Sequence, residues 1–188
     1  MKKIVVIALA LFVYLALPNP ATCDVRIGFG AHYYHIPDSH YKEVYREGNN
    51  MFAAAICAKV IKKFEGRVEV NYFQKKGRTT FKQESVTLIL TPVLAGMRFR
   101  ITDTRQVSPY LGAGIAYFVY KEKVPESFGD DVSDSTIGFH GEIGVYFHMG
   151  KKFLLDINFR YIKANAKPFE EKIGLGGLRA GFELEYRF

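Results

Sequence analysis

Residues 178–188 read LRAGFELEYRF and alternate apolar with polar side chains without a break. The polar positions hold only charged residues and Gly181. The apolar positions hold Leu178, Ala180, Phe182, Leu184, Tyr186 and Phe188. Because successive side chains of a β-strand point to opposite faces, this period of two predicts a strand with one wholly apolar face.

The same alternation recurs along the chain from residue 24 onward and predicts an all-β protein. The eight predicted strands cover residues 24–35, 50–61, 65–75, 84–101, 108–121, 136–148, 152–163 and 174–188. The connections between them are alternately long and short. An antiparallel up-and-down barrel in a membrane has this pattern, with short turns at one end and longer loops at the other.

Pro92 lies inside the fourth predicted strand. Proline has no backbone hydrogen to donate to a neighbouring strand, and within sheets it is confined to edges and bulges. The sequence therefore predicts a bulge or a local bend at this position.

The direction of the apolar face separates two classes of barrel. A soluble lipocalin-type barrel encloses an apolar lumen, whereas a membrane barrel has an apolar exterior. The strand glycines share the charged face, as expected for the crowded lumen of a small barrel. Aromatic residues on the apolar face gather near both strand ends, as two membrane interfaces require. The sequence thus predicts a transmembrane barrel with a polar lumen filled by side chains, and the soluble barrel is the alternative.

The composition of the chain excludes several classes of protein. Of its 188 residues, 48% are hydrophobic and 24% are charged, which excludes a disordered chain and a bundle of membrane helices. Two cysteines are too few for a disulfide framework. The formal charge of +7 is spread over many predicted strands without a nucleic-acid motif, so we expect no nucleic-acid partner.

The amino terminus has the three zones of a secretory signal peptide. Lys2 and Lys3 precede the uncharged run 4–17, and small residues precede Asp24. The run reaches about 21 Å as a helix, short of a hydrocarbon core of about 30 Å. We expect a cleaved signal peptide over residues 1–23 and a barrel domain over 24–188. Cleavage after Ala21 and lipidation of Cys23 are the alternatives.

The signal peptide, the segment SPYLGAG at residues 108–114 and the alternating carboxyl end resemble one known family. It is the small outer-membrane β-barrel domain family, related to the OmpA and OmpX barrels of Gram-negative bacteria. The resemblance implies an integral protein of the bacterial outer membrane. The ending also resembles the signal read by the barrel assembly machinery, which implies that machinery as a partner during insertion. The residues that match the signal are Phe182, Leu184, Tyr186 and Phe188.

The charged faces of the strands predict a network of ion pairs in the lumen. An eight-stranded barrel is just wide enough to be filled by its own side chains, and charges confined there must pair. We expect a structural plug, with a narrow channel or carrier for ions or small solutes as the alternative function. The predicted members are Arg26, Arg67, Glu69, Arg98, Arg100, His140, Glu142, Asp156, Arg160, Arg179, Glu183, Glu185 and Arg187.

No group of residues has the spacing of a catalytic or metal site. The candidates His32, His35, His40, His140 and His148 do not combine with Ser39, Ser133 or Ser135 as a nucleophile with its base. The run from His32 to His40 is not a zinc motif. We therefore expect no enzyme, no cofactor and no metal. A lipid-modifying enzyme is the second alternative, because some small outer-membrane barrels have that activity.

The long loops are the remaining functional surface, since binding residues favour loops on a rigid scaffold. The loop at 124–136 carries the acids Glu126, Asp130, Asp131 and Asp134. The second long loop and its rim carry Lys75, Lys76, Arg78 and Lys82. The simplest interpretation of these charges is a solvated loop. Alternatively, such bases could meet lipopolysaccharide phosphates, and such acids could share divalent cations. We expect a monomer with a structural or loop-mediated interaction role, in contact with outer-membrane lipid and lipopolysaccharide.

Overall fold

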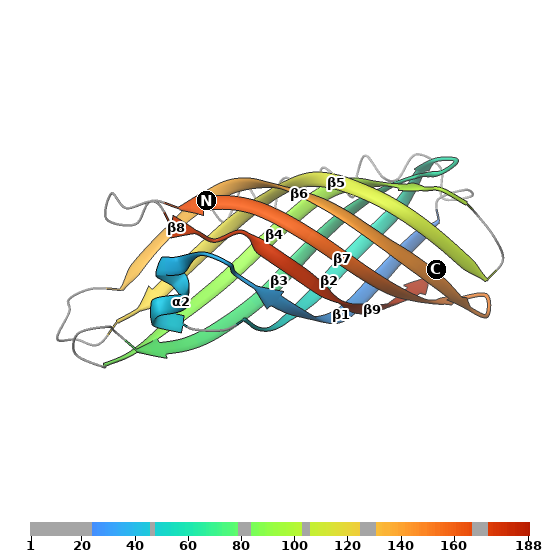
Figure 1. Ribbon diagram of the computed structural model, residues 1–188. Helices are drawn as coiled ribbons and strands as arrows, with labels where there is room; N and C mark the ends of the chain where they lie inside the picture. Colours follow the sequence, from blue (N-terminus) through green and yellow to red (C-terminus); the bar gives the residue numbers. More distant parts are fainter. Residues whose placement is uncertain (1–23, 46–47, 79–83, 103–105, 125–130, 167–172) are drawn as a thin grey trace.

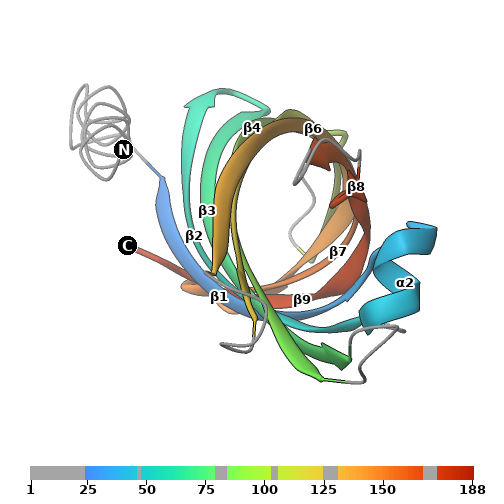
Figure 2. The same ribbon diagram turned by 90° about the vertical axis from the view of Figure 1, so that its left-hand side faces the viewer.

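The computed structural model describes residues 24–45, 48–78, 84–102, 106–124, 131–166 and 173–188. Eight long strands form a closed antiparallel barrel (Figures 1 and 2). These strands are β1 (Val25–His35), β2 (Asn49–Ile61), β3 (Phe64–Arg78), β4 (Ser85–Arg100), β5 (Val107–Lys123), β6 (Val132–Met149), β7 (Phe153–Ala166) and β9 (Gly177–Arg187). The helix α2 (Ser39–Tyr45) and the two-residue strand β8 (Ile173–Gly174) lie at the end that carries the long loops. Among the described residues, no helix is both long and apolar enough to cross a membrane.

The barrel closes between its first and last strands. Each long strand from β1 to β7 pairs with the next, and β9 pairs with both β7 and β1. The β1–β9 ladder runs from Arg26 opposite Arg187 to His35 opposite Leu178. The sequence prediction of an eight-stranded up-and-down barrel is therefore confirmed.

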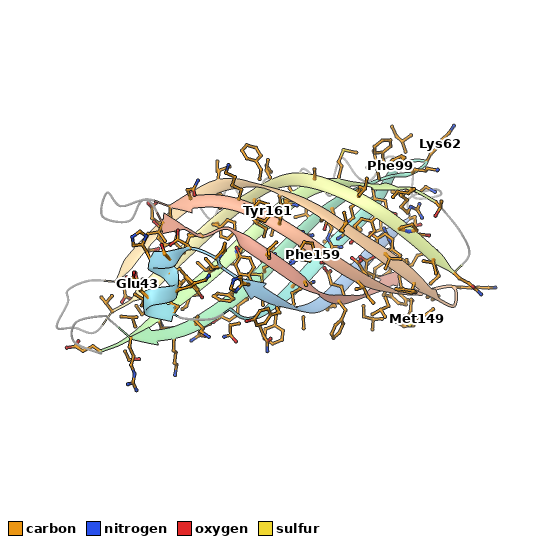
Figure 3. The ribbon with its side chains drawn as sticks, in the orientation of Figure 1. Glu43, Lys62, Phe99, Met149, Phe159 and Tyr161 are labelled. Atoms are coloured by element: carbon orange, nitrogen blue, oxygen red, sulfur yellow. The ribbon has the colours of Figure 1, made fainter. Side chains whose placement is uncertain are left out.

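The two faces of each strand meet different surroundings. In β9, Phe182 and Leu184 are 56% and 46% exposed on the outside, whereas Glu183 and Glu185 are fully buried inside. Large exposed hydrophobic residues cover the exterior of the other strands too, so the soluble alternative with an apolar face turned inward is excluded. In Figure 3, Phe99 and Met149 mark the short-turn end, Glu43 marks the loop end, and Phe159 and Tyr161 lie on the wall between them.

Pro92 is accommodated without the predicted bulge. The β4–β5 register passes through Pro92 opposite Phe118 without a shift. On the other side, the β3–β4 ladder has the same register at Val70 opposite Val93 and at Phe73 opposite Leu90. The side-chain amide of Asn71 donates to the Pro92 carbonyl at 3.3 Å and supplies a hydrogen bond within this interrupted stretch.

The helix α2 lies in the segment between the first two predicted strands, which the sequence predicts to be a loop. Asp38 caps it, because its Oδ1 accepts a hydrogen bond from the Tyr41 backbone nitrogen at 3.2 Å. The other oxygen of Asp38 accepts from the Gly174 nitrogen at 2.9 Å and ties the helix to β8. With only seven residues, α2 is too short to produce a helical period in the sequence.

The lumen has two halves of different chemistry. The half nearer the short turns holds the predicted charges, while the half nearer the loops is apolar. The apolar side chains include Tyr34, Met51, Phe73, Leu88, Leu90, Phe118 and Ile162. Tyr41 and Tyr45 of α2 pack on this cluster, and the Tyr45 hydroxyl donates to Glu122 of β5. The polar lumen predicted from the sequence thus occupies one half of the barrel.

Gly112 makes room for the charged half of the lumen. It stands opposite Arg98 of β4 on one side and Glu142 of β6 on the other. A Cβ at this position would lie 2.7 Å from Cγ of Glu142 and 3.1 Å from Cγ of Arg98. The missing side chain lets the arginine and the glutamate meet across β5.

We expect Gly112→Ala to destabilise the barrel by about 1–3 kcal/mol, because the new methyl group displaces a tightly held ion pair. The free energy of unfolding in urea, measured in lipid or detergent, checks this. Gly141→Ala is the matched control, since a Cβ there has no neighbour nearer than 4.0 Å. Equal stability of the two variants would contradict the prediction.

Candidate functional site

The lumenal charges predicted from the sequence lie inside the barrel with one exception. Twelve of the thirteen are buried, with no more than 7% of any residue exposed. Arg187 is the exception: it is half-buried at the short-turn end, where its Nε lies 2.9 Å from Oδ1 of Asp24.

Glu142 of β6 lies at the centre of the network. Arg98 donates to both of its oxygens, at 2.8 and 3.0 Å. Arg160 donates to Oε2 of the same carboxylate at 2.5 and 3.0 Å. Two guanidinium groups from β4 and β7 therefore share one carboxylate, which fixes the relative positions of three strands.

Glu69 of β3 is a second centre. It accepts hydrogen bonds from Arg67, Arg160 and Arg179. Arg67 also donates to Glu185 at 2.9 Å and to Glu183, so β3 and β9 are joined across the lumen. Bonds of this length between charged groups are the stronger class of protein hydrogen bond.

Glu65 completes the network at the short-turn end and was not among the predicted residues. Its carboxylate lies 2.5 Å from Arg26 and 3.0 Å from Arg100. The alternation of β3 contains the signal for it, because residue 65 has the same parity as the predicted Arg67 and Glu69. Following the inward positions of β3 two residues back from Arg67 leads to Glu65.

Two lumenal tyrosines were also missed. The Tyr110 hydroxyl donates to Asp156 at 2.9 Å, and the Tyr146 hydroxyl donates to Glu65 at 3.0 Å. The guanidinium carbon of Arg98 lies 4.3 Å from the centre of the Tyr110 ring, within cation–π range. Aromatic residues on the charged face of a strand were the available signal.

Within the part of the chain that the structure describes, the buried arginines and carboxylates are equal in number. Six arginines face the six carboxylates Glu65, Glu69, Glu142, Asp156, Glu183 and Glu185. Such pairing offsets the cost of removing charges from water. The space lined by Arg67, His140, Glu142 and Arg160 has no room for a water molecule. The network therefore fills the lumen at this depth.

Asp156, Glu183 and Glu185 each offer an oxygen within 4.8 Å of the others, the spacing of a metal site. Arginines already engage these acids: Arg98 lies 3.0 Å from Asp156, and Arg67 reaches both glutamates. The surroundings therefore suit guanidinium groups rather than a cation.

Two of the candidate catalytic histidines lie beside acidic side chains. His32 lies 3.3 Å from Glu183 in the lumen, and exposed His40 lies 3.8 Å from Asp38 beside α2. The structure does form one serine–histidine pair that the sequence did not suggest, with Ser108 Oγ 3.1 Å from His148 Nε2. Ser108 is fully buried, so its hydroxyl is not accessible to a lipid substrate.

The remaining candidates are placed as follows. His35 ends β1 opposite Leu178, and His140 lies in the lumen beside Glu142. Ser39 begins α2, whereas Ser133 and Ser135 lie in β6. The candidates thus belong to several different elements.

Residues 7–188 match a family model described as the outer membrane protein beta-barrel domain. The chain belongs to this family. The lumenal network is accordingly the interior of an outer membrane barrel. Among curated proteins, none matches the sequence.

Several outer membrane barrels of known structure have a similar fold. The outer membrane protein OprG from Pseudomonas aeruginosa is 12% identical, with 88% of this chain and 95% of that chain covered and a TM-score of 0.71. Neisserial surface protein A is 17% identical, with 89% and 99% covered and a TM-score of 0.62. Ail of Yersinia pestis, solved with the heparin analogue sucrose octasulfate, is 18% identical, with 88% and 99% covered and a TM-score of 0.56. At these identities the similarity concerns the fold.

The predicted assembly signal lies on the outside of β9. Phe182, Leu184 and Phe188 are exposed to the surroundings of the barrel. Tyr186 contacts Phe153 and Phe188 edge-on, with ring centres 5.3 and 5.1 Å apart. Tyr186 and Phe188 thus belong to a cluster of aromatic rings at the short-turn end, and a role of the four residues in assembly stays a prediction.

We expect Glu142→Gln to destabilise the barrel by about 3–5 kcal/mol, because it leaves two buried arginines without their shared carboxylate. The measurement is the free energy of unfolding in urea. The control is Arg187→Gln, which removes a half-buried charge pair worth about 1 kcal/mol or less. If both variants lose the same stability, the network does not hold the barrel together.

Proposed function

We propose that this outer membrane barrel is a closed structural protein that interacts with its surroundings through its external loops and rim. The observation that carries the proposal is the filled lumen. At mid-depth, paired arginines and carboxylates leave no space for water between Glu69, Glu142 and their partners. A path for ions would need water or free charges along the axis.

The loop end supports the same conclusion. Tyr41 and Tyr45 of α2 pack on the apolar half of the lumen, and Tyr45 reaches Glu122 on β5. A solute entering from the loops would therefore meet this apolar cluster first and the ion pairs next. The interaction surface that is left consists of the loops, the rim and the lipid-facing wall.

The remaining parts of the proposal concern export and partners. We propose that residues 1–23, which lie outside the described residues, act as a cleaved signal peptide. Outer-membrane lipid and lipopolysaccharide are the proposed neighbours of the wall, with the assembly machinery acting during insertion. A monomer is the proposed state, since one chain closes its own barrel. We propose no lipid-modifying activity, because Ser108 faces the lumen and not the lipid.

A second candidate function is the carriage of small apolar solutes. The apolar loop-side half of the lumen favours it, because an ion path would be lined by polar groups. A depression of about 250 Å³ in the barrel wall lies beside this half and is lined in part by Ile162, Ala164 and Gly176.

We expect the purified protein to produce no stepwise conductance in planar bilayers, because the ion pairs close the lumen. Bilayers that respond to a general porin provide the control for sensitivity. Reproducible steps above the detergent background would overturn the closed-barrel proposal. The same protein in liposomes, tested for uptake of an apolar dye, separates the second candidate: faster uptake than in protein-free liposomes supports carriage.

We expect deletion of Phe188 to reduce the amount of folded protein in the outer membrane several-fold, because the ending loses its last aromatic residue. Membrane fractionation with heat-modifiable gel mobility measures this. Phe64→Leu, a change in an exposed aromatic at the same end but outside the signal, is the control. Unchanged yield after the deletion would show that the ending is not the assembly signal.

A further inference from the structure

Four cationic side chains gather on the outer face at the loop end of two strands, β3 and β5, which flank β4. Lys76 and Arg78 end β3, and Lys121 and Lys123 end β5. They share the parity of the outward residues on their strands, so they point away from the lumen. We call these four residues the cationic rim.

The register brings the two halves of the cationic rim together. Thr87 of β4 stands opposite Lys76 on one side and opposite Lys123 on the other. With neighbouring strands about 4.8 Å apart, the backbones at the two lysine positions are separated by about 10 Å, with the threonine between them. Arg78 stands opposite Ser85, which adds a second hydroxyl to the same patch.

The acids near the cationic rim neutralise only part of its charge. Asp131 lies 2.9 Å from Lys121, whose hydrogen bond lowers the pKa of this carboxyl. Glu84 precedes Ser85 and has interactions of its own. Glu122 is turned to the lumen and accepts from Tyr45. Counted over the described residues alone, four cations and two nearby acids leave this patch positive.

The surface directly below the cationic rim faces lipid. On β3 the outward residues that precede the cations are Val70 and Tyr72, which are 41% and 47% exposed, and then Gln74, which accepts a hydrogen bond from the Tyr72 hydroxyl at 2.8 Å. On β5 they are Tyr117 and Val119. Tyrosines at this level mark the boundary between hydrocarbon and headgroups. The cations therefore lie at the height of the headgroups, and they face sideways along the membrane.

We propose that the cationic rim binds the phosphate groups of lipid A in the outer leaflet, an inference that rests on the outer membrane location and the outward loops proposed above. Two phosphates on one lipid match cations whose backbones are about 10 Å apart, and hydroxyls between them can donate to the same oxygens. The acyl chains of that lipid pack on the apolar wall below. A soluble polyanion uses the charges but leaves the wall uncovered, so a lipid fits this surface better.

The test compares the full-length mature protein with Lys76→Gln/Lys123→Gln. Both are refolded in uncharged detergent, and binding of lipid A that carries both phosphates is measured by microscale thermophoresis. Dephosphorylated lipid A is the probe that keeps the acyl chains but lacks the phosphates. Sucrose octasulfate is the probe that carries negative charge but has no acyl chains. The matched control is Lys62→Gln/Lys151→Gln, which removes two exposed lysines at the short-turn end.

We expect the rim variant to bind the phosphorylated lipid about fivefold to tenfold more weakly, the sum of two exposed charge contacts. The control variant should bind as the wild type does, and the wild type should prefer the phosphorylated lipid over both other probes. Equal binding by rim and control variants overturns the proposal. Equal binding of the dephosphorylated lipid, or stronger binding of the soluble polyanion, overturns it as well. Heat-modifiable mobility of each variant confirms folding, and fractionation separately tests the outer membrane location.

Discussion

The hydrogen-bonding of β9 to two partners is the interaction on which this structure depends. Hydrocarbon offers no partner to a backbone amide, so a strand can cross a membrane only if both of its edges are paired. The last strand meets this condition by pairing with β7 on one side and β1 on the other. Without this closure, two edges of a long sheet would be left open in lipid.

Closure also sets what the interior can contain. Eight strands leave a lumen that side chains fill, so the charged side chains on the inward faces are forced against one another. The structure resolves this by joining arginines and carboxylates that lie far apart in sequence, such as Arg67 with Glu185. Gly112 contributes by its small size, since Arg98 and Glu142 meet across it.

The sequence predicted the parts of the fold that depend on side-chain parity. The strands, the closed barrel and the inward direction of charges such as Glu183 follow from a period of two. Partners across the lumen do not, because the pairing of Arg160 with Glu69 depends on barrel curvature and side-chain length. The helix α2 was missed because its stability comes from packing of Tyr41 and Tyr45 rather than from a repeated pattern.

The apolar half of the lumen was missed for a related reason. The period of two predicts which face of a strand a residue occupies, but not which residues it meets across the lumen. The inward Leu88 and Leu90 belong to the same apolar cluster as Phe73 and Phe118, which lie on other strands. The bulge predicted at Pro92, where the missing donor was expected to shift the register, does not form. The strands on both sides hold the register, and the Asn71 amide bonds to the carbonyl.

The division of the lumen explains why the charges matter for more than stability. A shift of one residue between paired strands exchanges their two faces. In the loop-side half, the inward and outward faces of the strands are both largely apolar. Such a shift would therefore replace one apolar side chain by another on each face. In the charged half it would place Arg98 or Glu69 in hydrocarbon, at a cost of several kcal/mol for each unpaired ion. The ion pairs at mid-depth therefore specify the register of the whole barrel. The loop-side half does not determine the register, and it can therefore hold an apolar cluster with the helix α2 packed against it.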